Sequence, residues 1–365
     1  MLNREEIVKV LGRYDLENLK VGTIGSHSAL DICDGAKEEG LDTVVVCQRG
    51  REKTYLRYKR IIGKVIILNS YADMIKEDIQ EELRRLNVIF TANRSFSTYV
   101  GYDNIENRFL IPIFGNRAML RSEERDVPRN QMYLLEKAGI KYPTKFNSPN
   151  EIDRLVIVKV PEAKRKIERA FFYANSPEDF RTKADARIRK GIISSTELEK
   201  ATIEEFVMGA KFNFNYFWSP LDDQVEFLGV DRRIQTDLDG ILSLPARDQL
   251  ELDSVIQNIE VGHEGATVRE SILERVYEIG EKFVETCKRE YPPGIIGPFA
   301  LQGAITKELD ICIFDVSPRV PGSPIISTTS PYSRWYFGEP MSTGRRIALE
   351  ISKAKQQGRL SEVVT

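Results

Sequence analysis

Four short apolar runs within the first 100 residues constrain the fold of this chain more than any other feature. The runs cover residues 21–24, 43–47, 65–68 and 88–91. Their length is that of strands buried on both faces of a parallel sheet. The intervening residues 28–39 and 74–86 carry apolar side chains at helical spacing. The pattern predicts an open α/β layer, in which ligands bind outside the carboxyl ends of the strands.

Beyond residue 120 the pattern of elements changes. The charged segment Arg121–Asp126, followed by Pro128, is typical of a domain boundary. Apolar runs then predict further strands at residues 155–160, 168–174, 201–207, 211–218, 297–305 and 309–316. One helix is expected to begin at Ser176 and Pro177, a favoured N-cap and first residue. Two more helices are expected, at residues 267–289 and from Ser342 onward.

Composition excludes several classes of protein. The 365 residues include 41% hydrophobic side chains, and 53 basic residues balance 55 acidic ones, so nothing indicates a nucleic-acid or membrane surface. The first residues are charged where a signal peptide would be apolar, and no run is long enough to span a membrane. We therefore expect a cytoplasmic protein. Four widely separated cysteines and only two histidines argue against a disulfide framework and a multi-histidine metal centre.

The first candidate site is the segment Gly25–Ser28, which follows a predicted strand and opens a helix. Free backbone N–H groups at such a turn attract anions, and His27 with its flanking serines adds donors for a phosphate or carboxylate. The alternative is a capping serine beside an incidental histidine.

A second candidate is the pair Gln302 and Asp315, on two predicted strands joined by a turn near residues 306–308. A turn centred on Lys307 and Glu308 places both side chains on one face of the sheet as diagonal neighbours. A carboxylate and an amide oxygen suit Mg²⁺, which completes its shell with water and nucleotide phosphates. The alternative is that both residues simply face solvent.

The third candidate is Lys159, at the end of an apolar run and just before the charged loop 161–166. A lysine held on a strand is a suitable point charge for nucleotide phosphates. A later segment offers carboxylates for ribose hydroxyls and backbone groups for an adenine edge. It consists of Glu204, Glu205, Phe206 and Val207. An edge lysine and an ordinary amphipathic strand are the alternatives.

These features occur in the order found in ATP-grasp ligases, and several motifs extend the likeness across nearly the whole chain. The motifs are Gly25-Ser-His27, Phe114-Gly-Asn-Arg117, Pro245-Ala-Arg-Asp-Gln-Leu250, Pro292-Pro-Gly-Ile-Ile-Gly-Pro-Phe299, Leu301-Gln302 and Gly338-Glu-Pro340. With them the sequence resembles the PurP family, the archaeal formate-dependent ligases of aminoimidazole carboxamide ribonucleotide (AICAR). The resemblance implies an α/β plus α+β fold, with a Rossmann-like pre-ATP-grasp domain followed by a two-part ATP-grasp fold. The domains implied are 1–124 (substrate side), 125–209 (lid subdomain) and 210–365 (central subdomain with the metal site).

The resemblance also implies a reaction and roles for individual residues. ATP would phosphorylate formate, and the amine of AICAR would attack the formyl phosphate, giving formyl-AICAR, ADP and phosphate in purine (IMP) biosynthesis. ATP and Mg²⁺, or Mn²⁺, would be bound, and the protein would be a homo-oligomer, typically a hexamer. The residues implied are His27, Ser95 and His263 for AICAR, Lys159 and Glu204–Val207 for ATP, Gln302 and Asp315 for the metal, and Arg319 with His27 for catalysis.

Three departures from the family pattern leave other activities open. The loop after Lys159, residues 161–169, contains no glycine, although the family usually brings backbone N–H groups to the phosphates there. Residues 320–325 replace a segment that normally carries paired glycines and an amide side chain, and His263 stands where asparagine is usual. The alternatives are therefore a catalytically reduced, nucleotide-binding paralogue and an ATP-grasp ligase for another amine.

Overall fold

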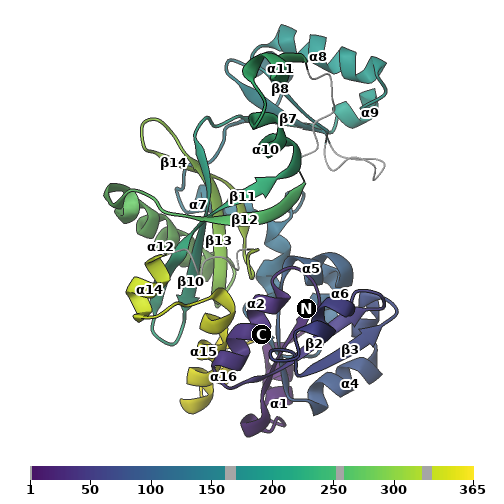
Figure 1. Cartoon of the computed structure of the whole chain (residues 1–365), viewed down its shortest axis with the longest axis vertical. Coiled ribbons are helices and arrows are strands. Elements are labelled where there is room, and N and C mark those ends of the chain that lie inside the picture. Colours follow the sequence, from purple (N-terminus) through teal and green to yellow (C-terminus); the bar gives the residue numbers. More distant parts are fainter. Residues whose placement is uncertain (1, 161–169, 252–258, 323–330) are drawn as a thin grey trace.

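The computed structural model describes residues 2–160, 170–251, 259–322 and 331–365. Within these residues the chain builds three β-sheets that follow one another along the long axis of the molecule (Figure 1). A parallel sheet near the N-terminus lies at the bottom of the view, an antiparallel sheet in the middle, and a smaller antiparallel sheet at the top. None of the helices in these ranges has the length and apolar character needed to cross a membrane.

The N-terminal sheet has the strand order of a doubly wound α/β fold. Its strands, in spatial order, are β3 (Lys64–Leu68), β2 (Asp42–Gln48), β1 (Lys20–Ile24), β4 (Val88–Thr91) and β5 (Ile113–Phe114), all parallel. The helices around it are α1 (Arg4–Leu11), α2 (Ala29–Glu38), α3 (Lys53–Arg57), α4 (Glu77–Arg85), α5 (Arg94–Val100) and α6 (Tyr102–Asn107). Because sequence order reverses between β1 and β4, the turns after these two strands meet at one edge of the sheet.

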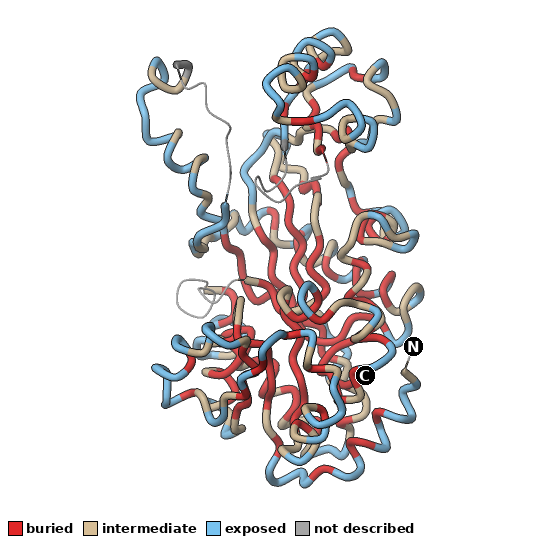
Figure 2. Tube along the Cα trace, turned by 90° about the vertical axis from the view of Figure 1, so that its right-hand side faces the viewer, coloured by how far each residue is buried: buried red, intermediate tan, exposed pale blue. Residues whose placement is uncertain are grey.

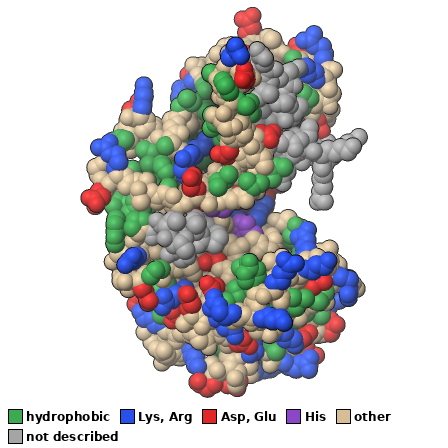
Figure 3. Space-filling view, in the orientation of Figure 1, with side chains coloured by type: hydrophobic (Ala, Val, Ile, Leu, Met, Phe, Trp, Pro, Cys, Tyr) green, Lys and Arg blue, Asp and Glu red, His purple; other side chains and the backbone are tan. Residues whose placement is uncertain are grey.

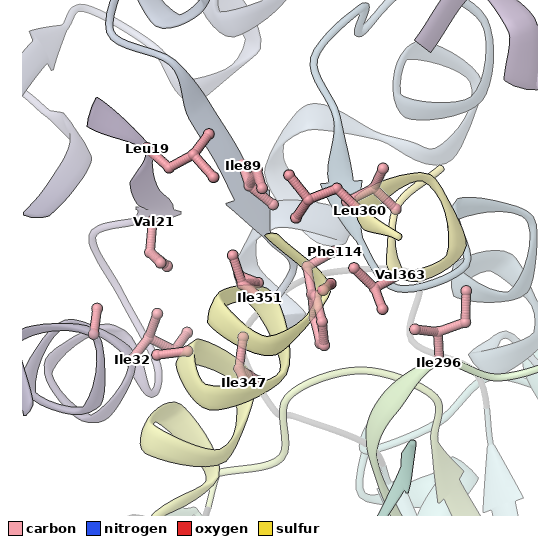
Figure 4. Packing of buried hydrophobic residues seen from close by; sticks show 14 of the residues in the cluster. Leu19, Val21, Ile32, Ile89, Phe114, Ile296, Ile347, Ile351, Leu360 and Val363 are labelled. Carbon is pink, nitrogen blue, oxygen red and sulfur yellow. The ribbon is translucent and has the colours of Figure 1, made fainter. Parts of the chain in front are cut away.

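The last helices of the chain, α15 (Thr343–Gln356) and α16 (Leu360–Val363), pack on this N-terminal sheet. Figure 4 shows Ile347 and Ile351 of α15 among the same buried residues as Val21 of β1 and Ile32 of α2. A Cβ on Gly35 of α2 would lie 1.9 Å from the backbone nitrogen of Arg345 in α15, so the two helices approach as closely as glycine allows. The two ends of the sequence are thereby joined in one core.

The central sheet has one apolar face, covered by helices. Its strands, in spatial order, are β12 (Glu260–Ala266), β11 (Gln224–Gln235), β10 (Ala210–Ser219), β13 (Gly297–Ile305) and β14 (Ile311–Ser317). The helices that cover it are α7 (Gln131–Lys137), α12 (Leu273–Glu290) and α14 (Pro331–Phe337), whereas α10 (Thr236–Leu242) and α11 (Ala246–Glu251) follow β11 outside this core. Phe214 and Tyr216 of β10 pack with Val276 and Phe283 of α12 in one buried cluster. Figure 2 shows buried residues (red) along the strands in the middle of the molecule.

The third sheet belongs to a small lobe. Its strands, in spatial order, are β6 (Lys145–Phe146), β9 (Thr202–Glu205), β7 (Val156–Val160) and β8 (Ala170–Ala174), and its helices are α8 (Pro177–Arg189) and α9 (Ser195–Leu198). As predicted, Ser176 caps α8, accepting a hydrogen bond from the backbone N–H of Asp179, and Pro177 is the first helical residue. The lobe has a separate apolar cluster that includes Val158 and Phe172.

Most of the predicted elements are confirmed, but one helix is shorter than predicted and two strands of the central sheet were missed. The helix expected at 267–289 begins only at Leu273, because the backbone N–H and C=O of Val268 bond to the Tyr332 hydroxyl (2.9 and 3.1 Å) instead of joining a helix. Strands β11 and β12 were not predicted, although they complete the central sheet. The domain boundaries at 124/125 and 209/210 stay predictions.

Candidate active site

The carboxyl edge of the N-terminal sheet holds predicted substrate residues side by side. Ser26 follows β1, Ser95 lies in the first turn of α5 after β4, and the Ser95 hydroxyl donates to the Ser26 hydroxyl at 2.7 Å. The side-chain amide of Asn93, the N-cap of α5, donates to the backbone oxygens of Ile24 (3.3 Å) and His27 (2.8 Å). The point where strand order reverses therefore fixes the turn that carries His27.

Ser28 does not cap the helix that it precedes. It stands at the N-cap position of α2 with φ of 65°, and its side chain makes no capping hydrogen bond. Its hydroxyl donates instead to the backbone oxygen of Pro321 at 2.7 Å and lies 3.2 Å from Nδ1 of His27. The alternative interpretation of Ser28 as a capping serine is therefore wrong, and its hydroxyl ties the turn to the segment after β14.

The two histidines of the chain meet at Gly322. A Cβ on this glycine would lie 2.3 Å from Nε2 of His27 and 3.2 Å from Nε2 of His263. Figure 3 shows histidine side chains (purple) at the waist between the two halves of the molecule. Burial lowers the pKa of His27 to about 4, and the positive charge of Arg319 adds to this effect. The His27 ring is thus neutral at pH 7.

His263 has the opposite electrostatic character. Its Nδ1 lies 2.6 Å from Oδ2 of Asp231 and its Nε2 lies 2.8 Å from Oε1 of Glu260. Burial opposes the charged form, but the bonds to these two carboxylates outweigh it and raise the pKa of His263 to about 9. The site therefore sets an imidazolium ion, flanked by carboxylates, against a neutral imidazole.

Four polar residues form a row across one face of the central sheet. Strand register pairs Asp231 with Asn213, Asn213 with Gln302, and Gln302 with Asp315. Residues directly opposite each other in antiparallel strands share a face. The Asn213 amide also donates to Asp231 at 2.7 Å. This polar row, Asp231-Asn213-Gln302-Asp315, leads from His263 across the sheet to the predicted metal residues.

Gln302 and Asp315 are paired more directly than the sequence predicted. The register shifts after Gln302, so that one extra residue of β14, Phe314, brings Asp315 opposite Gln302. The connecting loop closes through the Thr306 N–H, which donates to the Asp310 carbonyl at 2.9 Å. The predicted shared face is confirmed, whereas the predicted diagonal placement is wrong.

The opposite end of the polar row meets the small lobe. The Lys159 ammonium of β7 donates to Glu204 of β9, and Arg125 Nη1 donates to the same carboxylate at 3.0 Å. Arg125 Nη2 donates to the Phe314 carbonyl at 2.9 Å and lies 3.4 Å from Oδ1 of Asp315. Burial lowers the pKa of Lys159, and the positive charge of Arg125 lowers it further. Burial alone would raise the pKa of Glu204, but Lys159 and Arg125 outweigh it and lower that pKa.

The predicted nucleotide segment crosses from the small lobe to the central sheet. Glu205 accepts a hydrogen bond from the Thr144 N–H at 3.2 Å, so ribose binding by this carboxylate would replace an existing contact. The Phe206 ring packs edge-on against Tyr173 at 4.9 Å, and its N–H donates to the Leu155 carbonyl at 2.9 Å. Val207 follows the end of β9. The segment is held in place, with its Phe206 ring beside the lobe.

Arg319 follows β14 and is held by a carboxylate. Its Nε and Nη2 donate to the two oxygens of Glu123 at 3.2 and 2.5 Å, and its Nη1 donates to its neighbour's backbone oxygen. A second cation, Arg94, lies 3.6 Å from Glu123. Such a two-point contact fixes the plane of the guanidinium, which lies within electrostatic reach of His27.

A divalent metal suits the donors at this end of the polar row. Asp315 supplies a carboxylate and Gln302 an amide oxygen, both hard oxygen ligands of the kind that Mg²⁺ prefers. Within the described ranges, no group of three or more His, Cys, Asp or Glu side chains is placed to hold a metal by itself.

Several residues of this constellation were not identified from the sequence. They are Asn213, Asn215, Asp231, Glu123 and Arg125. The two asparagines alternate with Phe212, Phe214 and Tyr216 along one strand, and that alternation was the available signal. Of the noted departures, loop 161–169 and residues 323–325 lie outside the described residues.

The charge on His263 predicts a specific dependence of stability on pH. Its folded-state pKa of about 9 exceeds the ordinary value of 6.5, so its contribution is complete below pH 6.5 and disappears as the pH rises through 9. The difference corresponds to roughly 3 kcal/mol. Urea unfolding between pH 6 and 9.5 should show this loss for the wild type but not for His263→Asn. Parallel curves for the two proteins would contradict the assignment.

The sequence also matches known families and relatives. Residues 179–365 match a family described as a domain of unknown function (DUF1297), and residues 21–146 match one described as a protein of unknown function (DUF1246). The chain is 45% identical to the 5-formaminoimidazole-4-carboxamide-1-(beta)-D-ribofuranosyl 5'-monophosphate synthetase of Methanopyrus kandleri, over 100% of both chains. It is 41% identical to the synthetase of the same name from Methanocaldococcus jannaschii, again over 100% of both chains.

Solved structures agree with these relatives. An IMP biosynthesis protein PurP from Thermococcus kodakaraensis superposes with a TM-score of 0.71 at 29% identity, covering 94% of this chain and 100% of that one. An ADP complex of the N5-carboxyaminoimidazole ribonucleotide synthetase purK superposes with a TM-score of 0.58 at 13% identity, covering 89% of this chain and 78% of that one, which shows a shared fold alone. The fold is therefore that of the ATP-grasp enzymes, and the chain belongs to the PurP family of 5-formaminoimidazole-4-carboxamide-1-(beta)-D-ribofuranosyl 5'-monophosphate synthetases.

Proposed function

We propose that this protein is an ATP-dependent ligase that formylates AICAR with formate in purine biosynthesis, releasing ADP and phosphate. Full-length relatives at 39–45% identity are named as synthetases of 5-formaminoimidazole-4-carboxamide ribonucleotide, which is the formylated product. Small-molecule substrates follow from this assignment. The hexamer and the cytoplasmic location that the resemblance implies stay predictions.

A line of polar side chains between the two predicted binding regions carries the proposal. It starts at Lys159, passes through Glu204 and Arg125 to Asp315, and follows the strand register of the polar row to Asp231. Asp231 contacts His263, which lies beside the same face of Gly322 as His27. A ligase of this type must hold ATP and the acceptor amine in one site, because the acyl phosphate must be attacked before water reaches it. The line of polar side chains supports such a shared site, since it joins residues that are far apart in sequence.

The N-terminal edge is suited to the ribonucleotide substrate. Neutral His27 can donate or accept a hydrogen bond, and Ser95 adds a hydroxyl beside it. The imidazolium of His263 supplies positive charge beside the same face of Gly322. We assign these three side chains to AICAR.

The other end is suited to the nucleotide. Lys159 would neutralise ATP phosphates, and Glu204–Val207 would line the base and ribose. Gln302 and Asp315 would hold Mg²⁺, which when bound supplies positive charge that stabilises the phosphates during transfer. Arg319, fixed by Glu123, would place a further cation beside the formyl phosphate. The reaction depends on positioning and charge, so no side chain needs to act as a nucleophile.

The activity can be tested by measuring phosphate release with purified protein. ATP, Mg²⁺, formate and AICAR together should give ADP, phosphate and formyl-AICAR, and omission of any one should stop the reaction. Release without formate would contradict the proposal, and formate-dependent release with another amine in place of AICAR would favour the ATP-grasp ligase for another amine. ATP binding with no release would favour the catalytically reduced paralogue.

A further inference from the structure

We propose that Arg125 is a positioning residue of this site, which holds Glu204 and Asp315 together and gives up Asp315 to the divalent cation when a metal–nucleotide complex binds. The inference rests on the proposed function, because it assigns the cation to Asp315. It adds a residue that lies outside the strands of the ATP-grasp sheets, in the segment between the N-terminal sheet and α7.

The contacts of Arg125 join the small lobe to the central sheet. One amino group donates to Glu204 of β9, which is only 2% exposed. The other donates to the Phe314 carbonyl and faces the Asp315 carboxylate of β14 at 3.4 Å. The guanidinium is therefore a cation that the protein itself places in contact with the predicted metal ligand.

The backbone around Arg125 is anchored independently of its side chain. The Asn130 side chain, which caps α7, donates to the Arg125 carbonyl at 2.9 Å. The buried Gln131 amide bridges this segment to β14, donating to the Glu123 carbonyl at 2.6 Å and accepting from the Val316 N–H at 2.6 Å. Substitution of the Arg125 side chain should therefore leave the local fold intact.

The neighbouring residues show that the segment has a positioning task. Glu123 holds Arg319 at the end of β14, and Glu124 holds Arg94 at 3.0 Å, next to the substrate residue Ser95. Three consecutive side chains thus contact the N-terminal domain, the central sheet and the small lobe. Arg125 is the one of the three that contacts both the lobe and the metal end of the polar row.

The charge of Arg125 must act on metal binding in a definite direction. A guanidinium near Asp315 neutralises that carboxylate and repels a second cation. Both side chains are about 30% exposed, which limits the size of the effect. Removing the charge should therefore tighten Mn²⁺ binding by about threefold. A residue that merely built the metal site would weaken Mn²⁺ binding when removed.

The test is Mn²⁺ binding in the presence of ADP, measured by electron paramagnetic resonance on the whole protein. Arg125→Ala should bind Mn²⁺ more tightly than the wild type, and Arg125→Lys, which keeps the charge, should match the wild type. Arg129→Ala is the matched control, because Arg129 lies in the same segment but pairs with Glu290. Asp315→Asn should lose the bound Mn²⁺, and this loss would show that the cation binds at Asp315.

Weaker or unchanged Mn²⁺ binding by Arg125→Ala would overturn the proposal, as would wild-type binding by Asp315→Asn. The measurement uses neither formate nor AICAR. Failure of the proposed function would instead appear as wild-type protein that releases no formate-dependent phosphate, so the two failures are distinguishable.

Discussion

Replacing Asp315 by asparagine is expected to lower the rate of formate-dependent phosphate release by on the order of 100-fold. The substitution keeps the shape of the side chain and one oxygen ligand but removes the negative charge that a divalent cation needs. It also leaves Arg125 with Glu204 as its one remaining carboxylate partner, so Arg125 and the metal would both face a neutral amide in place of the Asp315 carboxylate. The measurement is phosphate release over a range of Mg²⁺ concentrations, and half-maximal activity should need far more Mg²⁺.

Asp310→Asn is the matched control for this prediction. Asp310 is on the same hairpin, but it is half-exposed and pairs with Lys141 at 3.0 Å, away from the polar row. Its variant should stay within about twofold of the wild type, since an exposed ion pair contributes little. Equal losses in both variants would indicate damage to the hairpin, and full activity of Asp315→Asn would remove this residue from the metal site.

The N-terminal layer could be predicted from the sequence because its signals are local. Each of its first four strands contains a short apolar run, and all four appear within two residues of the predicted limits. Strands β1, β2 and β4 are buried on both faces, as such runs predict, whereas β3 lies at the edge of the sheet and is buried on one face. Strand β11 is buried over residues 226–231 and was missed despite this local signal, whereas β12 offers no such signal. β12 is exposed or half-buried throughout, so it carries no apolar run, and the sheet around it supplies its hydrogen bonds.

The candidate site was predictable only in part. Lys159, Gln302 and Asp315 stand on elements with clear periodicity, and the structure brings them together through contacts that involve Arg125 and Asn213. Arg125 lies in a charged segment that resembles an ordinary linker. Its contacts with Glu204 and Asp315 span 79 and 190 residues, and no local pattern encodes a pairing at that distance. The bulge at Phe314 is likewise a property of the paired strands.

The selectivity of the substrate end can be tested at His27. His27→Ala should lower kcat/KM for AICAR by about 100-fold, because a buried polar contact with the substrate is lost, while the affinity for ATP stays within about twofold. The fold should persist, since the turn is fixed by the backbone oxygen of His27, which accepts from Asn93, and by the Ser28 hydroxyl. Steady-state kinetics with varied AICAR and calorimetry with a non-hydrolysable ATP analogue give the two quantities.

His263→Asn provides the contrast for His27→Ala, because it changes the other histidine at Gly322 to the residue that the family usually has there. Asparagine keeps a hydrogen-bonding side chain next to Asp231, so activity with AICAR should remain within about fivefold of the wild type. Comparing the two variants separates the loss of a substrate contact from a general effect of changing a histidine at Gly322. If both lost AICAR and ATP use to the same extent, His27 would be a structural residue, and the ribonucleotide would have to bind elsewhere than at the carboxyl edge of β1.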